Sequence, residues 1–214
     1  MPKKPLILIG GGGHCKSCIG VIESTGEWEI KGILDGNISR GAKILGYEII
    51  GNDTDIDELN DGLNQFFITV GQIKSAETRK RIYKSLKSKG ATIATIVSDK
   101  ASVSKHVTIG AGTIIHHFCI INADVVIGEN NIINTAANIE HDVNLGDNNH
   151  ISTGAILNGN IKIGNDCFIG SGTIIANGVS IADEIVVGAG SLIFKNIELA
   201  GIYAGSPVKM IKNG

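Results

Sequence analysis

The chain has 214 residues, of which 29 are glycine and 4% are aromatic, so we expect many turns and a core with few aromatic side chains. Hydrophobic residues make up 43% and charged residues 19%, which excludes a disordered chain, and no apolar run approaches the roughly 18 residues of a membrane-spanning helix. The net charge of −2 excludes the basic surface on which nucleic-acid binding depends. We therefore expect a globular protein with no nucleic-acid partner and no membrane insertion.

The first residues do not resemble a secretory signal, because the apolar run after residues 1–5 extends only over residues 6–9. We therefore expect a cytoplasmic chain. Because the cytosol keeps thiols reduced, all four cysteines are predicted to be free: Cys15, Cys18, Cys119 and Cys167.

The first hundred residues alternate short apolar runs with helical patterns, which is typical of a small, parallel, Rossmann-like α/β domain. The predicted elements are a strand at 6–9, a glycine turn at 10–13, a helix at 15–24, strands at 28–34 and 66–70, a helix at 75–89 between Ser75 and Gly90, and a strand at 91–97. We assign residues 1–97 to this α/β domain.

Glycines 10–13 lead from the first strand into the first helix. A turn without side chains lets a phosphate approach backbone N–H groups and a helix N-terminus. Asp35 follows Gly13 by 22 residues, about where an acidic residue binds ribose in dinucleotide sites. These features indicate a nucleotide site, with a tight ligand-free turn as the alternative. A nicotinamide oxidoreductase is disfavoured because the α/β unit ends within about 100 residues, too early for a complete dinucleotide fold.

Cys15 and Cys18 form a C-x-x-C pair at the start of the first helix, a pattern found in redox and zinc sites. The sequence has no second pair, and His14 is adjacent to Cys15, an unfavourable spacing for a shared metal. We therefore expect neither metal nor redox chemistry, and we interpret the isolated Cys119 and Cys167 as structural.

From residue 101 onward the sequence repeats every six residues. This period fits short strands joined by tight corners, each strand burying one aliphatic side chain. Glycine recurs every eighteen residues at Gly110, Gly128, Gly146 and Gly164, which indicates three strands per coil. We predict a β-helix of five to six triangular coils without an insertion. The third residue of each hexad is aliphatic at Val103, Ile109, Ile115, Ile121, Ile127, Ile133, Ile139, Leu145, Ile151, Leu157, Ile163, Ile169, Ile175, Ile181, Val187, Ile193 and Leu199.

His141 is the most informative histidine of the repeats, because Glu140 and Asp142 flank it. A carboxylate can hold one ring nitrogen and leave the other as a proton acceptor, which is the arrangement of a general base. A solvated, charged turn is the alternative. The other histidines are predicted to be exposed or to lie at edges and subunit contacts: His106, His116 and His117.

His150 follows His141 by nine residues, which is half of an eighteen-residue coil. At about 3.3 Å per extended residue the coil perimeter is roughly 55–60 Å, so the two imidazoles of one chain are predicted to lie more than about 10 Å apart. They can share a site only across a subunit interface. This geometry favours a homotrimer with sites between the prisms.

Together these motifs resemble the bacterial sugar acyltransferase family that includes UDP-4-amino-sugar N-acetyltransferases of the PglD type and sialic acid O-acetyltransferases of the NeuD type. The resemblance rests on GGGGHCK at 10–16, LDG at 34–36, NTAANIEHD at 134–142, HIS at 150–152, the hexads, and YAGSPVKMI at 203–211. It implies that the β-helix is left-handed and that residues 98–214 form an acetyltransferase domain with a short C-terminal tail.

The resemblance also implies roles for individual residues. His141 matches the general base, and either Asp142 or Glu140 orients it. The residues that match acetyl-CoA contacts are His150, Gly159, Gly170 and Gly188, with the Gly159 N–H beside the thioester oxygen. The residues that match the nucleotide-sugar site are Gly11, Gly12, Gly13, His14, Asp35 and, on the sugar side, Asn134. No metal takes part.

The implied activity is direct transfer of an acetyl group from acetyl-CoA to a nucleotide-linked amino sugar, in bacterial glycan and surface polysaccharide biosynthesis. O-acetylation of sialic acid or a related nonulosonic acid needs the same base and is the alternative. A nucleotide-sugar-binding β-helix scaffold without catalysis is disfavoured by the triplet at 140–142. The sequence does not define the nucleotide or the sugar.

Overall fold

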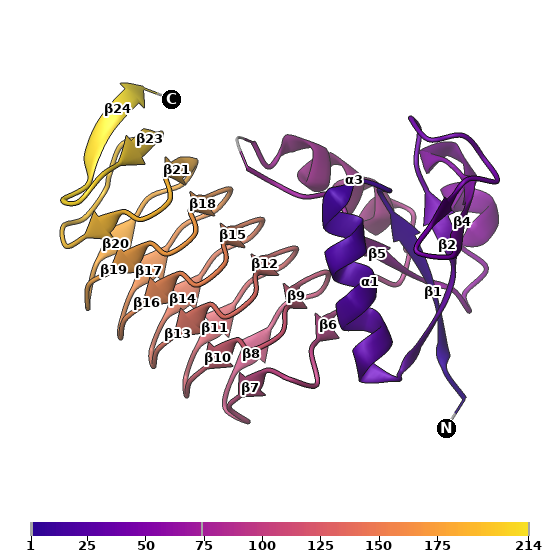
Figure 1. Cartoon of the computed structure of the whole chain (residues 1–214), viewed down its shortest axis with the longest axis horizontal. Helices are drawn as coiled ribbons and strands as arrows, with labels where there is room; N and C mark the ends of the chain where they lie inside the picture. Colours follow the sequence, from indigo (N-terminus) through magenta and orange to yellow (C-terminus); the bar gives the residue numbers. More distant parts are fainter. Residues whose placement is uncertain (1, 74, 214) are drawn as a thin grey trace. The chain divides into compact units, whose positions relative to one another are not determined.

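The computed structural model describes residues 2–73 and 75–213, and the chain forms two compact units (Figure 1). Unit 1 comprises residues 1–71 and 77–99, and unit 2 comprises residues 72–76 and 100–214. The main difference from the predicted domains is the segment 72–76, which lies with unit 2. Within the described part of the chain, no helix is both long enough and apolar enough to cross a membrane.

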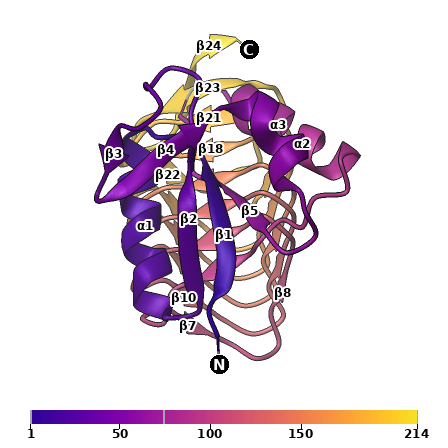
Figure 2. The same ribbon diagram turned by 90° about the vertical axis from the view of Figure 1, so that its right-hand side faces the viewer.

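Unit 1 is built on a five-stranded sheet with the order β3-β4-β2-β1-β5 (Figure 2). Strands β4, β2, β1 and β5 are parallel, and β3 pairs antiparallel with β4. The elements are β1 (Lys4–Ile9), α1 (Gly13–Thr25), β2 (Trp28–Leu34), β3 (Lys43–Ile44), β4 (Tyr47–Gly51), the 3-10 helix η1 (Asp53–Asp55), α2 (Ile56–Leu59), β5 (Gln65–Ile68), α3 (Glu77–Ser88) and β6 (Ile96–Val97). The chain leaves β1 toward β2 on one side and returns to β5 on the other. The carboxyl ends of β1 and β5 therefore form the switch point at which α/β sheets bind ligands.

Residues 6–9 of β1 are buried on both faces, as expected for the centre of a parallel sheet. Ile7 and Ile9 belong to a core cluster that includes Ile82 and Leu86 of α3. Leu6 and Leu8 alternate to the other face and are also fully buried. Burial on both faces explains why residues 6–9 are all aliphatic, whereas Lys4, at the start of the strand, is exposed.

Arg79 of α3 fixes the end of β5. Its side chain is 1% exposed, and Nη1 donates to the carbonyl oxygens of Ile68 and Val70, each at 2.8 Å. Burial lowers the pKa of Arg79 to about 10, which still leaves the guanidinium charged at neutral pH. The two hydrogen bonds hold the chain where it leaves the sheet.

Most of the predicted elements of unit 1 are present. The helix predicted at 75–89 begins two residues after Ser75 and ends before Gly90, whose φ of +64° stops it. The predicted strand at 91–97 is wrong, because only β6 and a single bridge between Phe66 and Ile93 form there. The sequence did not predict the elements between β2 and β5, because their apolar residues occur in pairs too short to show a period.

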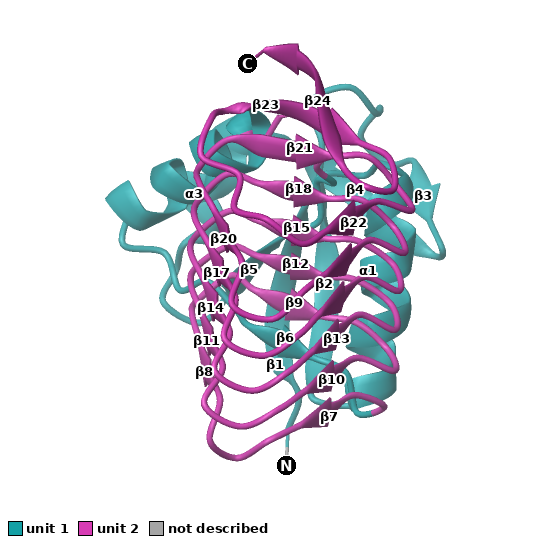
Figure 3. Cartoon of the chain, turned by 90° about the vertical axis from the view of Figure 1, so that its left-hand side faces the viewer, with its two compact units in different colours: residues 1–71, 77–99 teal, residues 72–76, 100–214 magenta. Residues whose placement is uncertain are grey.

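Unit 2 consists of a parallel β-helix that ends in a hairpin, and Figure 3 shows its strands stacked in three columns. The first sheet contains β7 (Ser102–Val103), β10 (Ile120–Ile121), β13 (Asn138–Ile139), β16 (Ile156–Leu157), β19 (Ile174–Ile175) and β22 (Leu192–Ile193). The second contains β8 (Thr108–Ile109), β11 (Val126–Ile127), β14 (Asn144–Leu145), β17 (Lys162–Ile163) and β20 (Ser180–Ile181). The third contains β9 (Ile114–Ile115), β12 (Ile132–Ile133), β15 (His150–Ile151), β18 (Phe168–Ile169), β21 (Ile185–Val187), β23 (Gly201–Ala204) and β24 (Lys209–Asn213).

From β7 to β22, paired strands of the β-helix are eighteen residues apart, for example Ile121 with Ile139. The aliphatic residue of each hexad is buried from Ile115 through Ile193, which confirms the predicted core. The prediction is wrong at Leu199, whose side chain is 67% exposed. Ile197 is buried instead and bridges to Ile181, sixteen residues earlier, because the last coil is shorter than the others.

Most corners of the β-helix contain a residue with positive φ at the sixth position of the hexad. Asparagine, aspartate and glycine occupy most of these positions, since they adopt this conformation with little strain. Asp142 is one of them, with a φ of 62°. The corner geometry therefore favours aspartate at the residue after His141.

Candidate active site

His141 lies at the corner that follows β13. Its Nδ1 is 2.8 Å from Oδ2 of Asp142, and both side chains are more than half exposed. Because a carboxylate only accepts hydrogen bonds, Nδ1 is the protonated ring nitrogen and Nε2 carries the free lone pair. The arrangement gives an oriented imidazole with an accessible proton acceptor.

Gly159 lies beside the His141 ring, one coil further along the β-helix. A Cβ atom at residue 159 would be 2.6 Å from Cε1 and 2.8 Å from Nε2 of His141. Only glycine leaves room for the imidazole in this position. Among the described residues, the Gly159 N–H donates to no backbone carbonyl.

Glu140, the other acidic neighbour of His141, is bonded elsewhere. Its Oε2 accepts from Nδ2 of Asn122 at 2.6 Å, and its Oε1 accepts from Nδ2 of Asn138 at 3.1 Å. The geometry therefore assigns Asp142, and not Glu140, to the His141 ring.

His150, at the start of β15, is only 7% exposed and both ring nitrogens have partners. Nδ1 donates to the carbonyl oxygen of Gln72 at 2.6 Å, and Nε2 accepts from Nδ2 of Asn134 at 3.1 Å. The backbone N–H of Thr135 donates to Oδ1 of Asn134, which fixes the orientation of that amide. Phe168 packs edge-on against the imidazole, with ring centroids 5.2 Å apart. His150 is thus a neutral residue that positions Asn134.

Gln72 was not among the residues singled out from the sequence. It is 3% exposed, and its Nε2 donates to the carbonyl oxygens of Asn148 and Cys167. These bonds place the Gln72 carbonyl where His150 needs an acceptor. A single glutamine in a loop without periodicity carries no sequence signal for this role.

Gly170 and Gly188 use their N–H groups within the β-helix, where they donate to the carbonyls of Val187 and Tyr203. A Cβ at residue 170 would lie 2.5 Å from the backbone nitrogen of Ala189. Close packing between coils thus accounts for glycine at residue 170, and its predicted contact with acetyl-CoA stays a prediction.

In unit 1, the glycine turn is held by Asp35. Oδ2 accepts from the N–H of Gly11 at 2.6 Å, while Oδ1 accepts from the N–H groups of Asn37 and Ile38. Gly12 and Gly13 are exposed, with open space around them, at the N-terminus of α1, and His14 lies half-buried in its first turn. The structure therefore brings the predicted nucleotide-site residues together, but it shows the Asp35 carboxylate bonded to the backbone.

A pocket of about 210 Å³ opens beside this turn, at the carboxyl ends of β1, β2 and β5. Ile9, Leu34 and Val70 form its apolar wall. Asp53 of η1 and Arg81 of α3 supply charges to it, with Oδ2 and Nη2 3.8 Å apart. Neither residue was predicted from the sequence, because they belong to segments that only the fold brings together.

The cysteines are free and buried. Burial raises the pKa of the Cys18 thiol, and it raises the pKa of Cys119 to about 11 and of Cys167 to about 12. The thiols of Cys119 and Cys167 donate to backbone carbonyls of Asn134 and Ala182. Protonated, hydrogen-bonded thiols fit the structural role expected from the sequence.

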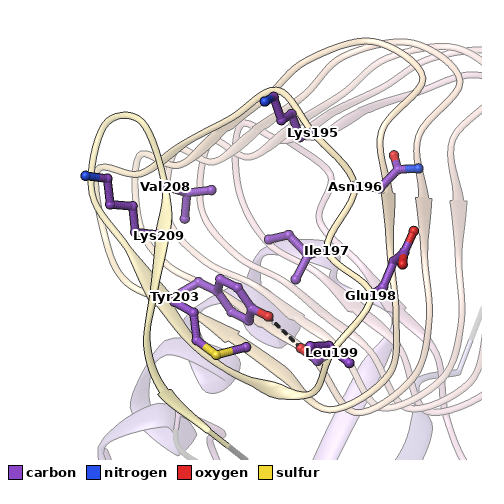
Figure 4. Close-up of a pocket in the computed structure, with 9 residues that line it drawn as sticks. Lys195, Asn196, Ile197, Glu198, Leu199, Tyr203, Val208 and Lys209 are labelled. Carbon is purple, nitrogen blue, oxygen red and sulfur yellow. Dashed lines mark hydrogen bonds between the residues drawn. The ribbon is translucent and has the colours of Figure 1, made fainter.

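A second pocket, of about 490 Å³, lies at the C-terminal end of the β-helix (Figure 4). The Tyr203 hydroxyl donates to the carbonyl of Leu199 at 2.8 Å and closes one side. Lys195 and Lys209 lie at its rim, and Ile197 and Val208 line it. The pocket therefore combines an apolar floor with two cations.

Comparison with known proteins gives two family matches. Residues 5–86 match the PglD N-terminal domain, and residues 160–195 match the hexapeptide repeat of succinyl-transferase. By sequence, no protein with a curated description matches the chain.

Several solved structures are similar over nearly the whole chain. The acetyltransferase domain of PglB from Neisseria gonorrhoeae FA1090, in complex with acetyl coenzyme A, is 27% identical with a TM-score of 0.92 and covers 98% of this chain and 100% of its own. A mutant of perosamine N-acetyltransferase from Caulobacter crescentus, in complex with CoA and GDP-perosamine, is 29% identical with a TM-score of 0.90 and 96% coverage of both chains. WeeI from Acinetobacter baumannii AYE, at 20% identity and a TM-score of 0.84, shows the fold alone.

These matches confirm the predicted fold, an α/β domain followed by a left-handed parallel β-helix. They also confirm the resemblance to sugar acyltransferases of the PglD and NeuD type.

Proposed function

We propose that this chain, an acyltransferase of the hexapeptide-repeat type, transfers the acetyl group of acetyl-CoA to the amino group of a nucleotide-linked amino sugar. The similar structures contain acetyl coenzyme A in one case and CoA with GDP-perosamine in another, which supports both substrate classes. We place the reaction in the cytoplasm and in bacterial glycan biosynthesis, and the four free cysteines support that compartment.

The mechanism rests on the hydrogen bond between His141 and Asp142. As the sugar amine attacks the thioester carbonyl carbon, the accessible Nε2 of His141 takes its proton, while Asp142 holds the ring through Nδ1–H. The new C–N bond forms, the C–S bond breaks, and the imidazolium returns its proton to the departing CoA thiolate. The reaction passes through no covalent enzyme intermediate.

The Gly159 N–H serves as the donor to the oxygen of the tetrahedral intermediate. It lies next to the base and uses no acceptor among the described residues, so it can bond to a developing oxyanion without first losing a partner. The same glycine therefore makes room for the base and stabilises the transition state.

Acetyl-CoA extends from His141 along the β-helix toward its C-terminal end. Coils are spaced by about 4.8 Å, so Lys195, two coils beyond Gly159, lies roughly 10 Å further along. Lys195 and Lys209 at the rim of the C-terminal pocket suit the phosphates of CoA. His150 matches a contact of acetyl-CoA, and through its hydrogen bond it also holds Asn134, the residue on the sugar side.

The sugar nucleotide binds to unit 1. Its diphosphate lies at the exposed Gly12 and Gly13, where the N-terminus of α1 has no side-chain cap and its N–H groups favour an anion. The adjacent pocket at the carboxyl ends of β1, β2 and β5 takes the base. Asp35 supports the site by holding the turn in shape.

The active form is a homotrimer. The outer face of the first sheet of unit 2 presents Ile120 and Ile174, which are 45% and 41% exposed, together with Ile156 and Leu192. The corresponding face of the second sheet is mainly polar. Because His141 lies two residues after the end of β13 of the first sheet, a partner on the apolar face lies next to the base.

The proposed function is tested by incubating the full chain with acetyl-CoA and a panel of nucleotide-linked amino sugars. We expect release of free CoA thiol and one added acetyl group on the sugar that resists mild hydroxylamine, as an amide does. An acetyl group lost under these conditions would be an ester and would identify the O-acetyltransferase alternative. No transfer to any acceptor of the panel would contradict the proposal.

A further inference from the structure

We propose that the pocket of unit 1 selects guanine nucleotides, with Asp53 and Arg81 recognising adjacent edges of the base. This inference rests on the proposed function, in which the acceptor is a sugar linked to a nucleoside diphosphate, and it specifies the nucleotide. It uses the described residues of unit 1 alone.

Asp35 is not the residue that selects the base. Its two oxygens accept three backbone N–H groups, from Gly11, Asn37 and Ile38, at 2.6 to 3.1 Å. A carboxylate with these partners holds the loop after β2 against the glycine turn. Recognition of the base therefore falls to the other polar side chains of the pocket.

The charged side chains that line the pocket, besides Asp35, are Asp53 and Arg81. Oδ2 of Asp53 is 3.8 Å from Nη2 of Arg81, longer than a hydrogen bond, and the two side chains are 43% and 67% exposed. The two side chains are not hydrogen-bonded to each other, so both can bind a third partner. Asn52 and Asp55 cap η1 and fix the backbone of Asp53, so its carboxylate plays no part in the cap.

Guanine matches this pair of charges. Its N1–H and N2–H groups are adjacent donors that a carboxylate accepts together, while O6 and N7 are adjacent acceptors that a guanidinium reaches with two N–H groups. O6 is bonded to the carbon next to N1, so the two partners of guanine must lie side by side. The neighbouring Asp53 and Arg81 fulfil this requirement.

The other bases fit the pair less well. Uracil offers Asp53 a single N3–H between two carbonyl oxygens, which repel a carboxylate. Adenine presents an unprotonated N1 where guanine has a donor. A good bidentate pair discriminates between bases by roughly tenfold to a hundredfold, so we expect a preference of that size for GDP.

The test is calorimetric titration of the full chain with GDP, UDP, dTDP, CDP and ADP. We expect GDP to bind at least about tenfold more tightly than the others. Arg81→Gln should weaken GDP binding about tenfold, whereas Arg40→Gln, at an exposed arginine outside the pocket, should leave it unchanged. Equal affinities for GDP and UDP, or no loss in Arg81→Gln, would overturn the assignment.

Asp53→Asn should gain affinity for a different nucleotide, and a misfolded variant would not show such a gain. Xanthine carries a carbonyl oxygen at C2 in place of the guanine amino group, and an asparagine amide can donate to that oxygen. We expect Asp53→Asn to lose affinity for GDP about tenfold and to gain affinity for xanthosine diphosphate, with Asp124→Asn, in unit 2, as the matched control. Unchanged preference in Asp53→Asn would overturn the role of Asp53.

Acetyl transfer separates this inference from the proposed function. Transfer to a UDP-linked amino sugar with equal or greater efficiency than to a GDP-linked one would reject guanine selection and retain the acetyltransferase. Tight GDP binding without acetyl transfer to any acceptor would retain the guanine pocket and reject the function.

Discussion

The His141 imidazole and the backbone of Gly159 occupy adjoining positions on neighbouring coils, so close that a single methyl group on Gly159 would be 2.6 Å from Cε1 of the ring. The eighteen-residue repeat of the β-helix sets this relationship. It places the proposed proton acceptor beside the proposed oxyanion donor, without help from a loop.

Gly159→Ala should therefore displace the His141 ring. We expect kcat to fall about tenfold to a hundredfold, because the added methyl group moves the base out of line. The matched control is Gly20→Ala in α1, where an added Cβ meets nothing within 4 Å and should raise stability by about 0.5–1 kcal/mol. Steady-state kinetics and thermal denaturation of both variants check the prediction, which fails if Gly159→Ala keeps normal turnover.

The repetitive part of the structure was predictable because each coil repeats the same physical requirement. An aliphatic side chain must fill every strand position facing the interior, so the pattern holds from Ile115 to Ile193 and ends only where the last coil shortens before Leu199. The His141 triplet was also visible, since a histidine between two acids is local. Which acid orients the ring depended on the bonds of Glu140, to Asn138 two residues earlier and to Asn122 on the preceding coil, and only the structure shows them.

The remainder of the site depends on tertiary contacts that have no local signature. Gln72 contacts His150 across 78 residues of chain, and Asp53 meets Arg81 only because α3 lies beside the end of β4 and η1 in unit 1. Asp35 was correctly placed near the glycine turn. Its two oxygens, however, are bonded to backbone N–H groups, which a residue type alone does not reveal.

His150→Ala should act on both stability and acetyl-CoA binding. The carbonyl of Gln72 and the amide of Asn134 would lose a buried partner, so we expect the free energy of unfolding to fall by about 2–4 kcal/mol. Because His150 matches an acetyl-CoA contact, its loss should also raise the KM for acetyl-CoA about tenfold, with a smaller effect on kcat. His106→Ala, at an exposed histidine, is the control. An unchanged KM would remove His150 from the acetyl-CoA site.

Ile174→Lys should dissociate the proposed trimer. A lysine at this position would bury a charge in the apolar subunit contact, so we expect a monomer and a loss of activity at micromolar concentration. Val126→Lys is the matched control, since Val126 is also 41% exposed but lies on the second sheet. Sedimentation velocity distinguishes the two variants. A wild-type chain that sediments as an active monomer contradicts the shared-site arrangement.

Stability should depend on pH through His116. Burial, together with the neighbouring His150 and His117, lowers its pKa to about 4, whereas an unfolded histidine titrates near 6.5. Between these values the unfolded chain binds the additional proton, so the free energy of unfolding falls as the pH drops from about 6.5 to about 4. The free energy of unfolding is measured by denaturant titration at each pH. We expect it to fall less steeply with decreasing pH in His116→Asn than in wild type over this range. Equal slopes would show that another group dominates.

The most direct test of the account is the turnover of His141→Ala. If His141 is the general base, kcat falls by about 10²–10⁴, while the dissociation constants of acetyl-CoA and the nucleotide sugar change little. The kcat of Asp142→Asn should fall by less, because this substitution disturbs the orientation of the ring and leaves Nε2 in place. A His141→Ala chain that keeps more than about a tenth of wild-type kcat would contradict the account, since the proton of the acceptor amine would then leave by another route.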